Sequence, residues 1–449
     1  MQKGDKKTIR GWVFYDWANS VYNLVISSAI FPIFYSNVTK NKYLERFPDR
    51  EELLPNEKVM VDFFGMEVEN QLLITYILSF SFLVVSVLSP FLSGIADVVG
   101  SKKRFLQFFC YLGSFACMGL YFFSENISIG MISIFLASIG FWNSLVFYNA
   151  YLPEIAEPKD HDKISAKGFS MGYFGAMILL VLSLFMIMSS DETNGLYNAS
   201  IASWWRVEYS FIGVGIWWLG FSQITFRALP HNVYNRKKEK GYIWKGFKEL
   251  KAVFQEFRKT KRLKRFLMSF FFFNTGVQTV MLMAVYFAKE EIEWGPGGGD
   301  TGLIVSILLI QILAAVGAFV MSRTSSLLGN INTLKIVVAL WFILCVVAYY
   351  ITTPVEFYLL AAGVGLVMGG VQALARSTYS KFLPDTKDHA SYFSFYDSTE
   401  KIGIVLGTFF WGLVYGITGD LRDSVISITI FFALGMILLF FVPQKEKEA

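Results

Sequence analysis

The feature that most constrains this chain is a succession of twelve long apolar segments. Each has about the ~20 residues that a helix needs to cross ~30 Å of hydrocarbon at ~1.5 Å per residue. The segments are 12–36, 70–95, 105–124, 127–152, 168–189, 205–229, 266–288, 301–322, 336–352, 356–375, 393–418 and 424–443. A hydrophobic fraction of 54% and a mean hydropathy of +0.47 are too apolar for a soluble protein of this length. The sequence therefore predicts an all-α membrane protein with twelve transmembrane helices.

Lysine and arginine are unequally divided between the two sets of loops. Of 40 such residues, 30 lie in the N-terminus, the even-numbered loops and the C-terminus, 7 in the odd-numbered loops and 3 inside the segments. Because basic residues are retained on the cytoplasmic side, we predict a multi-pass protein of the cell (plasma or inner) membrane with both termini in the cytoplasm. This topology accounts for the net charge of +5, so a nucleic-acid partner is not expected.

The longest cytoplasmic loop divides the segments six and six. This predicts an N-terminal six-helix bundle at 1–229, a basic linker at 230–265 and a C-terminal six-helix bundle at 266–449. The stretches AYLPEIAEPKDH (150–161) and SKFLPDTKDH (380–389) end spans four and ten and indicate an internal repeat. Repeated six-span halves are typical of transporters with a solute site near the bilayer midplane. Twelve spans suffice to enclose a path, so we expect a functional monomer.

The linker carries 13 Lys and Arg against 3 acidic residues, and apolar residues recur in it at helical spacing. This pattern predicts a basic amphipathic helix lying on the inner leaflet, next to the lipid bilayer. A calmodulin-type target segment has the same pattern and remains an alternative. The apolar residues are Trp244, Phe247, Leu250, Phe254 and Phe257.

Ionisable side chains within the spans are candidates for function, because a charge at mid-bilayer costs ~3 kcal/mol. Asp16 lies in the first span, and Asn19 and Asn23 follow it on the same helix face. In the eleventh span Asp397 and Lys401 are spaced i,i+4 and are expected to pair. Glu400 is expected to project from another face of that helix. The remaining polar candidates are Asn149, the i,i+4 pair Asn274 and Gln278, and the i,i+4 pair Gln372 and Arg376.

These residues predict a buried polar layer on a solute or proton path. In this hypothesis Asp16 or Glu400 exchanges protons or meets a substrate ammonium. Lys401 or Arg376 then pairs with a substrate carboxylate or with the aspartates. The alternative is that Asp397 and Lys401 form an internal salt bridge that only holds helices together.

The sequence predicts no cofactor, disulfide framework or metal site. The three cysteines, Cys110, Cys117 and Cys345, all fall within spans. The three histidines lie at or beyond the cytoplasmic ends without metal-ligand spacing, and we expect them to be solvated. They are His161, His231 and His389.

The loop between spans two and three, GIADVVGSKKR, resembles the signature loop of the major facilitator superfamily. Glycine permits a tight turn, an aspartate can face a helix N-terminus, and basic residues can anchor to anionic headgroups. The resemblance implies a conformational gate that locks this loop against the eleventh span in one state and releases it in the other. The gate residues would be Gly94, Asp97, Gly100, Lys102, Lys103 and Arg104.

Five further segments carry a closer resemblance. They are VFYDWANSVYNLV (13–25), FYNAYLPEIA (147–156), ISAKGFSMGYFG (164–175), GGVQALARSTYSKFLP (369–384) and FYDSTEKIGIVLG (395–407). These resemble the "unknown major facilitator" branch of the superfamily and are similar to the autophagy-linked vacuolar amino-acid effluxers of fungi. The resemblance implies a secondary transporter with two pseudo-symmetric six-helix bundles, moving a small-molecule solute. Amino-acid export is the implied default.

Two other classes of function remain open from the residues. A polytopic enzyme such as a lipid-linked glycosyltransferase would use the acidic first outer loop (37–69), but no paired-carboxylate motif is evident and such enzymes usually lack a six-plus-six repeat. A channel or a lipid-moving protein on the same scaffold is the other class. The chain contains no P-loop, so an ATP-driven pump is not expected. Proton coupling and facilitated diffusion both fit the carboxylates within the spans.

Overall fold

The computed structural model describes residues 3–47, 49–50, 53–54, 57–190, 206–234, 236, 241–295 and 299–443. Within these residues eleven helices are long and apolar enough to cross a membrane. Helix α8 (Val207–Ala228) packs along α1 and α4, and its 22 residues extend ~33 Å, so it is the twelfth span. The prediction of an all-α membrane protein with twelve spans is confirmed.

The first span is one continuous helix of three parts, α1 (Lys6–Val21), the π-helical η1 (Tyr22–Ala29) and α2 (Ile30–Leu44). The other spans of the first half are α3 (Asn70–Val99), α4 (Lys102–Gly119), α5 (Ile127–Asn149), α7 (His161–Ser190) and α8. Those of the second half are α10 (Lys261–Glu291), α11 (Gly299–Leu328), α12 (Asn330–Tyr350), α13 (Pro354–Phe382), α14 (His389–Thr418) and α15 (Leu421–Phe440). Three short helices lie between spans: η2 (Leu120–Phe122), α6 (Leu152–Ile155) and η3 (Pro158–Asp160).

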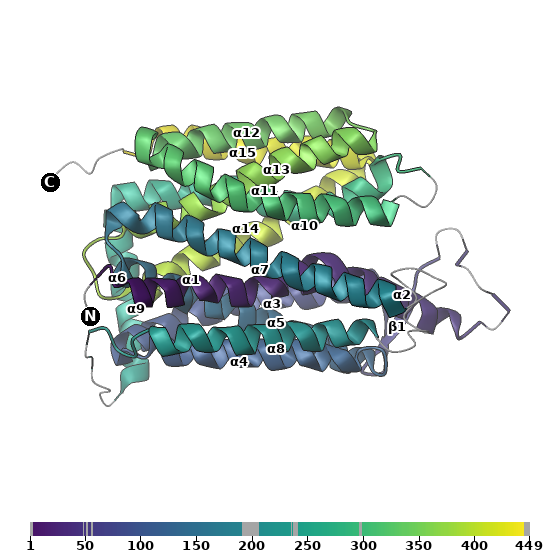
Figure 1. Cartoon of the computed structure of the whole chain (residues 1–449), viewed down its shortest axis with the longest axis horizontal. Helices are drawn as coiled ribbons and strands as arrows, with labels where there is room; N and C mark the ends of the chain where they lie inside the picture. The colour runs from purple at the N-terminus through teal and green to yellow at the C-terminus, as the bar shows by residue number, and fades with distance from the viewer. Residues whose placement is uncertain are drawn as a thin grey trace.

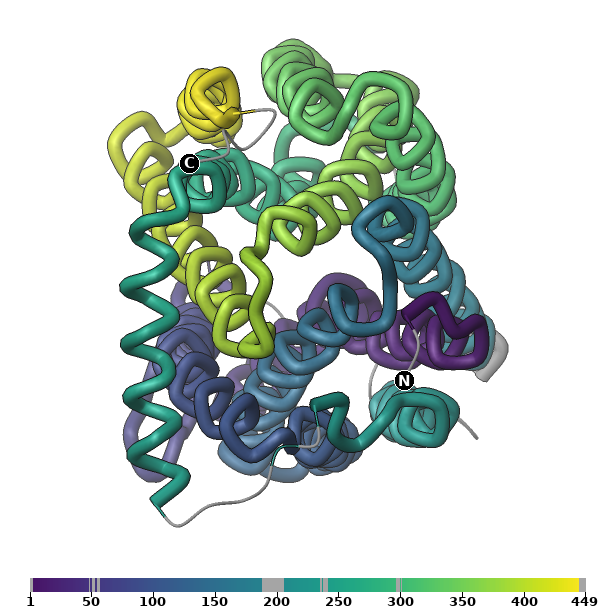
Figure 2. Tube along the Cα trace, turned by 90° about the vertical axis from the view of Figure 1, so that its left-hand side faces the viewer, coloured from purple at the N-terminus to yellow at the C-terminus, as the bar shows by residue number. Residues whose placement is uncertain are grey.

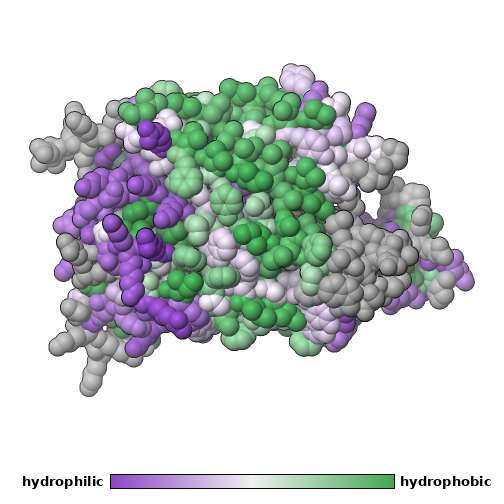
Figure 3. Space-filling model, viewed as in Figure 1, coloured by the Kyte–Doolittle hydropathy of each residue, from purple (hydrophilic) through white to green (hydrophobic). Residues whose placement is uncertain are grey.

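The helices run side by side between two polar ends (Figure 1). We call the end at which α1 begins, α15 ends and α9 (Tyr242–Lys259) lies the linker side, and the opposite end the hairpin side. Viewed along the helices, α1 to α8 occupy one part of the molecule and α10 to α15 the other (Figure 2). The halves meet where α7 packs on α11 and α13, and where α3 packs on α14. An apolar surface lies between the polar ends (Figure 3), as expected of a lipid-facing surface.

The first outer loop contains a small β-hairpin that the sequence analysis did not predict. Strands β1 (Met60–Phe63) and β2 (Met66–Glu69) pair antiparallel, with Met60 opposite Glu69. The two turn residues, Phe64 and Gly65, have φ of 54° and 81°, as a tight hairpin turn requires. The first span also extends to Leu44, beyond the predicted 12–36. Its end is held by Tyr35, whose hydroxyl donates to the carbonyl of Asn70 at 2.6 Å.

Candidate functional site

A charge pair joins the two halves on the linker side. Arg376 of α13 donates from both terminal nitrogens to one carboxylate oxygen of Asp16 in α1, at 3.2 Å each. The Tyr148 hydroxyl of α5 donates to the same oxygen at 2.8 Å. Arg376 also donates to the Ser165 hydroxyl of α7 at 2.9 Å and to the side-chain oxygen of Asn149 at 3.3 Å. Four spans thus meet at the Arg376 guanidinium. Arg376 is only 2% exposed.

Aromatic rings enclose this charge pair. The Arg376 guanidinium lies 4.1 Å from the ring centre of Phe169 and 4.8 Å from that of Trp12. A cation over aromatic faces is stabilised by the ring quadrupoles, more so when water is excluded. The Trp12 indole is itself held, because it donates to the carbonyl of Tyr148 at 2.9 Å. The arrangement compensates a buried cation in the closed linker side, where an unpaired one would be costly.

Glycine at position 168 allows α7 to approach this pair. A Cβ there would lie 2.3 Å from a carboxylate oxygen of Asp16 and 3.0 Å from a terminal nitrogen of Arg376. We expect Gly168→Ala to displace the Asp16 carboxylate and to lower transport about tenfold, equivalent to ~1.4 kcal/mol lost from the closed state. Solute flux in proteoliposomes measures this. Gly213→Ala in α8 is the matched control, because nothing lies within 4 Å of the added Cβ; equal flux in the two variants would contradict the expectation.

A second buried cluster lies on α14. The Lys401 ammonium is 2.9 Å from an oxygen of Asp397 and 3.1 Å from an oxygen of Glu400. It also lies 3.6 Å from the ring centre of Trp142 in α5, across the seam between the halves. The Gln278 side-chain amide of α10 donates to the Glu400 carboxylate. With both carboxylates ionised the three charged groups sum to −1, so the cluster attracts a cation or a proton.

The geometry corrects two expectations about pairing. Glu400 does not project away from Lys401. Its carboxylate contacts the ammonium of Lys401, the next residue of the helix. Gln372 does not pair with Arg376 along α13. Its side-chain oxygen instead accepts from the Tyr173 hydroxyl of α7 at 2.6 Å, because Arg376 is taken up by Asp16 and Ser165.

Apart from Asn149, the asparagines of the predicted layer make none of these bonds. The side-chain nitrogens of Asn19 and Asn274 are buried without a hydrogen-bond partner within the described residues. Asn23 is half-buried in η1, where the backbone changes to the wider π-helical turn. Asn19 and Asn274 are therefore the amides that a polar solute could still engage.

The predicted gate loop contacts the eleventh span. One Asp97 oxygen accepts from the backbone N–H and the hydroxyl of Ser391 at 2.7 and 2.8 Å, and the other accepts from the N–H of Ala390 at 3.3 Å. Asp97 thus faces the N-terminus of α14, where a negative charge is favoured. Gly100 has φ of 68°, which permits the turn into α4. Gly94 packs on Gly246 of α9, where a Cβ would lie 2.4 Å from the Gly246 carbonyl oxygen.

The basic residues of this loop are not all at the surface. Lys102 and Lys103 are 5% and 4% exposed, so the expectation that they anchor to headgroups is wrong for both. Lys102 contacts Glu154 of α6 and lies 3.7 Å from Asp97. Lys103 donates to the carbonyl of Leu229 at 2.8 Å. Arg104 is exposed and remains a candidate for headgroup contact.

Two further contacts across the seam were not predicted. His389 of α14 lies 3.1 Å from the carboxylate of Glu154, and only 6% of it is exposed. Asp162 of α7 accepts from Lys381 at 2.6 Å and from Asn330 at 2.7 Å, both in the second half. The expectation of solvated histidines is therefore wrong for His389 and also for His161, which is 1% exposed. His161 and His389 are the first residues of α7 and α14, and each of these spans packs on the other half. Sequence position alone does not indicate this placement.

The linker adds a pH-sensitive contact to this side. Arg236 donates to the Asp388 carboxylate at 2.7 Å and to the Asp97 carbonyl at 2.6 Å. Burial, followed by the neighbouring Asp388 carboxylate, raises the pKa of Glu249 in α9 to about 7, against the lowering effect of Arg236. A carboxyl whose pKa is raised in the docked state favours docking in its protonated form.

We therefore expect the docking of α9 to weaken as the pH rises through about 7, because Glu249 then ionises beside Asp388 and Asp97. Below its ordinary pKa of 4.5 the group is protonated in both states, and its contribution is fully present. Protection factors of the α9 amides, which are hydrogen-exchange rates normalised to the intrinsic rate at each pH, measure this at pH 6 and pH 8, with lower protection at pH 8. Glu249→Gln should remove the difference; an unchanged pH dependence in that variant would count against the assignment.

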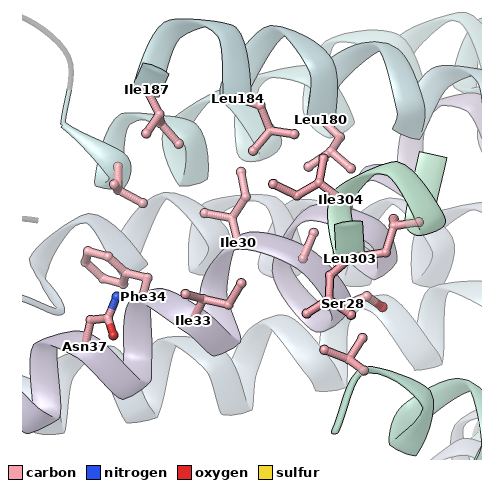
Figure 4. A pocket seen from close by; sticks show the side chains of 14 residues that line it. Ser28, Ile30, Ile33, Phe34, Asn37, Leu180, Leu184, Ile187, Leu303 and Ile304 are labelled. Atoms are coloured by element: carbon pink, nitrogen blue, oxygen red, sulfur yellow. The ribbon is translucent and has the colours of Figure 1, made fainter. Parts of the chain in front are cut away.

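On the hairpin side an apolar pocket opens between the halves (Figure 4). It has an empty volume of about 640 Å³ including its mouth. Its lining includes Ile30 and Phe34 of α2, Leu184 of α7, and Leu303 and Ile304 of α11. Ser28, the lining residue nearest Asp16 in the first span, is roughly 18 Å along the helix from it. The pocket thus lies between the halves on the hairpin side, whereas the Asp16–Arg376 pair lies toward the linker side.

The comparisons with known proteins agree with this architecture. The family model described as "Vacuole effluxer Atg22 like" matches residues 4–449. The chain belongs to this Atg22-like family. It is a major facilitator transporter, not an enzyme, and an integral multi-pass membrane protein. The resemblance stated from the sequence motifs is confirmed.

Relatives of this Atg22-like chain cover nearly all of it. The "uncharacterized MFS-type transporter YxiO" of Bacillus subtilis (strain 168) is 29% identical, over 99% of this chain and 97% of that protein. Autophagy-related protein 22 of Yarrowia lipolytica is 24% identical, over 87% of this chain and 79% of that protein. Among solved structures, the human organic anion transporter MFSD10 aligns with a TM-score of 0.69 at 11% identity, covering 98% and 100% of the two chains. The transporter FucP in its outward conformation aligns with a TM-score of 0.61 at 13% identity, and the alignment covers 98% of this chain and 99% of that chain. These structures share the fold.

Proposed function

We propose that this protein moves a small amine-bearing solute, an amino acid or a related metabolite, across the cell membrane by alternating access. The observation that carries the proposal is the Asp16–Arg376 pair, a buried charge pair that joins the first and tenth spans in this structure, where the linker side is closed. Breaking such a pair is costly unless both charges are rehydrated or find new partners. Opening the linker side exposes both to water. The pair therefore acts as a lock between two states of the transporter.

The cluster on α14 supports an ammonium or a proton as the ligand. Asp397 and Glu400 share the single cation Lys401, and one oxygen of Asp397 is buried without a hydrogen-bond partner in the described part of the chain. A second cation is attracted to such a site. Arg376 is neutralised by Asp16 in this state, so it receives a substrate carboxylate only after the lock opens. Binding of the two ends of an amino acid is thus linked to opposite states of the molecule.

The description of the family as vacuole effluxers supports export as the direction. The bacterial relative supports the cell membrane as the location. In the proposed orientation the linker side faces the cytoplasm, so both termini and α9 are cytoplasmic and the hairpin side is outside. A monomer encloses the path. Proton coupling follows from the proposal if Asp397 or Glu400 releases a proton when the ammonium binds.

The proposal is tested by counterflow in proteoliposomes. Vesicles are loaded with a pool of unlabelled amino acids, and entry of each labelled amino acid is measured with and without a pH gradient. Vesicles containing Arg376→Gln, and vesicles without protein, are the controls. Entry of at least one amino acid that requires the loaded pool, and that Arg376→Gln slows, is expected. Equal entry into all three kinds of vesicle would refute an amino-acid substrate.

A further inference from the structure

Helix α9 touches both halves of the molecule on the linker side. Its Gly246 lies against Gly94 and Ile95 of α3. Further along, the rings of Phe254 and Phe257 lie 5.8 and 6.1 Å from the ring of Phe395 in α14. In the view along the bundle, α9 runs along one edge of the molecule, across the ends of α3 and α14 (Figure 2). It therefore bridges the seam between the halves at its periphery, where lipid headgroups lie.

The surface of α9 is divided lengthwise. At ~100° per residue, Gly246 and Val253, the two buried residues, share the face toward the protein. Beside that face lies a strip of exposed apolar side chains. They are Ile243, Phe247 and Phe254, which are 46%, 53% and 46% exposed. Leaving large apolar side chains exposed is unfavourable in water, so this strip requires a cover.

Basic residues continue the surface beyond the apolar strip. Lys248, Lys251 and Arg258 are exposed and lie within ~140° of Ile243 around the helix. Trp244 lies among these basic residues and is 75% exposed. The acidic residues Glu249 and Glu256 lie on the opposite flank, where Glu249 is half-buried and Glu256 is exposed. An apolar strip with an aromatic residue and a cationic edge complements an anionic bilayer surface, into which the strip inserts while the cations meet lipid phosphates.

We propose that α9 is a docking surface for the anionic phospholipids of the adjacent leaflet, and that this docking straps α3 to α14 and so favours the state with a closed linker side. The lipid-docking part stands by itself; the coupling to a state rests on the proposed alternating access. When the linker side opens, α3 and α14 separate there, and α9 cannot keep both contacts. Lipid that holds α9 in place therefore opposes opening.

The test compares the intact protein in vesicles of phosphatidylcholine alone and of phosphatidylcholine with phosphatidylglycerol. Each cation near an anionic surface contributes about a fivefold gain in binding. Lys248→Gln/Lys251→Gln/Arg258→Gln should therefore lose up to about a hundredfold of the anionic-lipid protection of the α9 amides from hydrogen exchange. The control is Lys159→Gln/Lys163→Gln/Lys167→Gln, which removes the same charge from three exposed lysines around the start of α7. Exchange in α4 reports in each sample whether the fold is intact.

The expected result is slower α9 exchange with phosphatidylglycerol in the wild type and in the control, weakened by salt, and no such slowing in the α9 variant. Equal exchange in the two lipids, or equal behaviour of the two triple variants, would overturn lipid docking. None of these measurements needs a solute, so failure of the proposed transport would leave them unaffected. Spin labels across the linker side test the coupling; lipid-dependent exchange without a lipid-dependent distance would overturn the strap.

Discussion

Replacing Asp16 by asparagine is expected to lower solute flux about a hundredfold. The substitution leaves the Arg376 guanidinium buried without its carboxylate, which costs on the order of 3–5 kcal/mol for a buried pair. That cost falls on the state with a closed linker side. The transporter then remains open to the linker side and seldom presents its site on the hairpin side. Counterflow in proteoliposomes, with insertion checked by protease accessibility, measures the loss.

The double variant Asp16→Asn/Arg376→Gln separates the two roles considered for Asp16. It removes both charges, so the closed state no longer contains an unpaired cation. If the pair is a lock, counterflow in the double variant should recover above that of Asp16→Asn. No recovery, with normal protein levels, would show that the Asp16 carboxylate or the Arg376 guanidinium is itself needed on the path and would contradict a role confined to locking.

Loss of Glu400 and loss of Lys401 are expected to act in different ways. Glu400→Gln keeps the Asp397–Lys401 pair but removes the net charge of −1, so we expect normal folding and about a hundredfold weaker solute binding. Lys401→Gln leaves the buried Asp397 and the partly buried Glu400 without their cation, and we expect it to destabilise the fold by about 3–5 kcal/mol. Half-saturation of counterflow and thermal unfolding in detergent measure the two effects.

Glu67→Gln in the outer loop is the control for loss of a carboxylate, because its side chain is 60% exposed. Glu67→Gln should change neither the half-saturation of counterflow nor the thermal unfolding of the protein. If Glu400→Gln were as unstable as Lys401→Gln, the cluster would be a structural tie between helices. A Glu400→Gln variant with unchanged half-saturation and stability would remove Glu400 from the solute site.

The fold followed from the sequence because each span is specified locally, by length, hydropathy and the charges that flank it. The amphipathic helix α9 followed from its periodicity in the same way. The hairpin at Met60–Glu69 was missed because its four-residue strands are short and the loop was judged only by its acidity. The π-helical turn at Tyr22–Ala29 leaves no periodic signal in the sequence.

The site was predictable residue by residue but not as a set of contacts. Asp16 and Arg376 were both recognised as buried charges, yet they are 360 positions apart and their pairing depends on how the halves close. Glu154 and His389 were missed for the same reason. Each lies at the end of a span, where a solvated position is expected, yet both are buried and in contact with each other across the seam between the halves. Such contacts belong to the closed state of the linker side, which no local pattern encodes.

A distance across the linker side reports directly whether the Asp16–Arg376 pair controls alternating access. Spin labels at Lys163→Cys in α7 and Ser326→Cys in α11 lie on exposed positions beside the Asp162–Ser325 contact, and the native cysteines are buried. Pulsed electron paramagnetic resonance should show one short distance in the wild type. A second, longer distance should appear with transported solute and become dominant in Asp16→Asn. A single short distance that neither solute nor Asp16→Asn alters would contradict alternating access controlled by this charge pair.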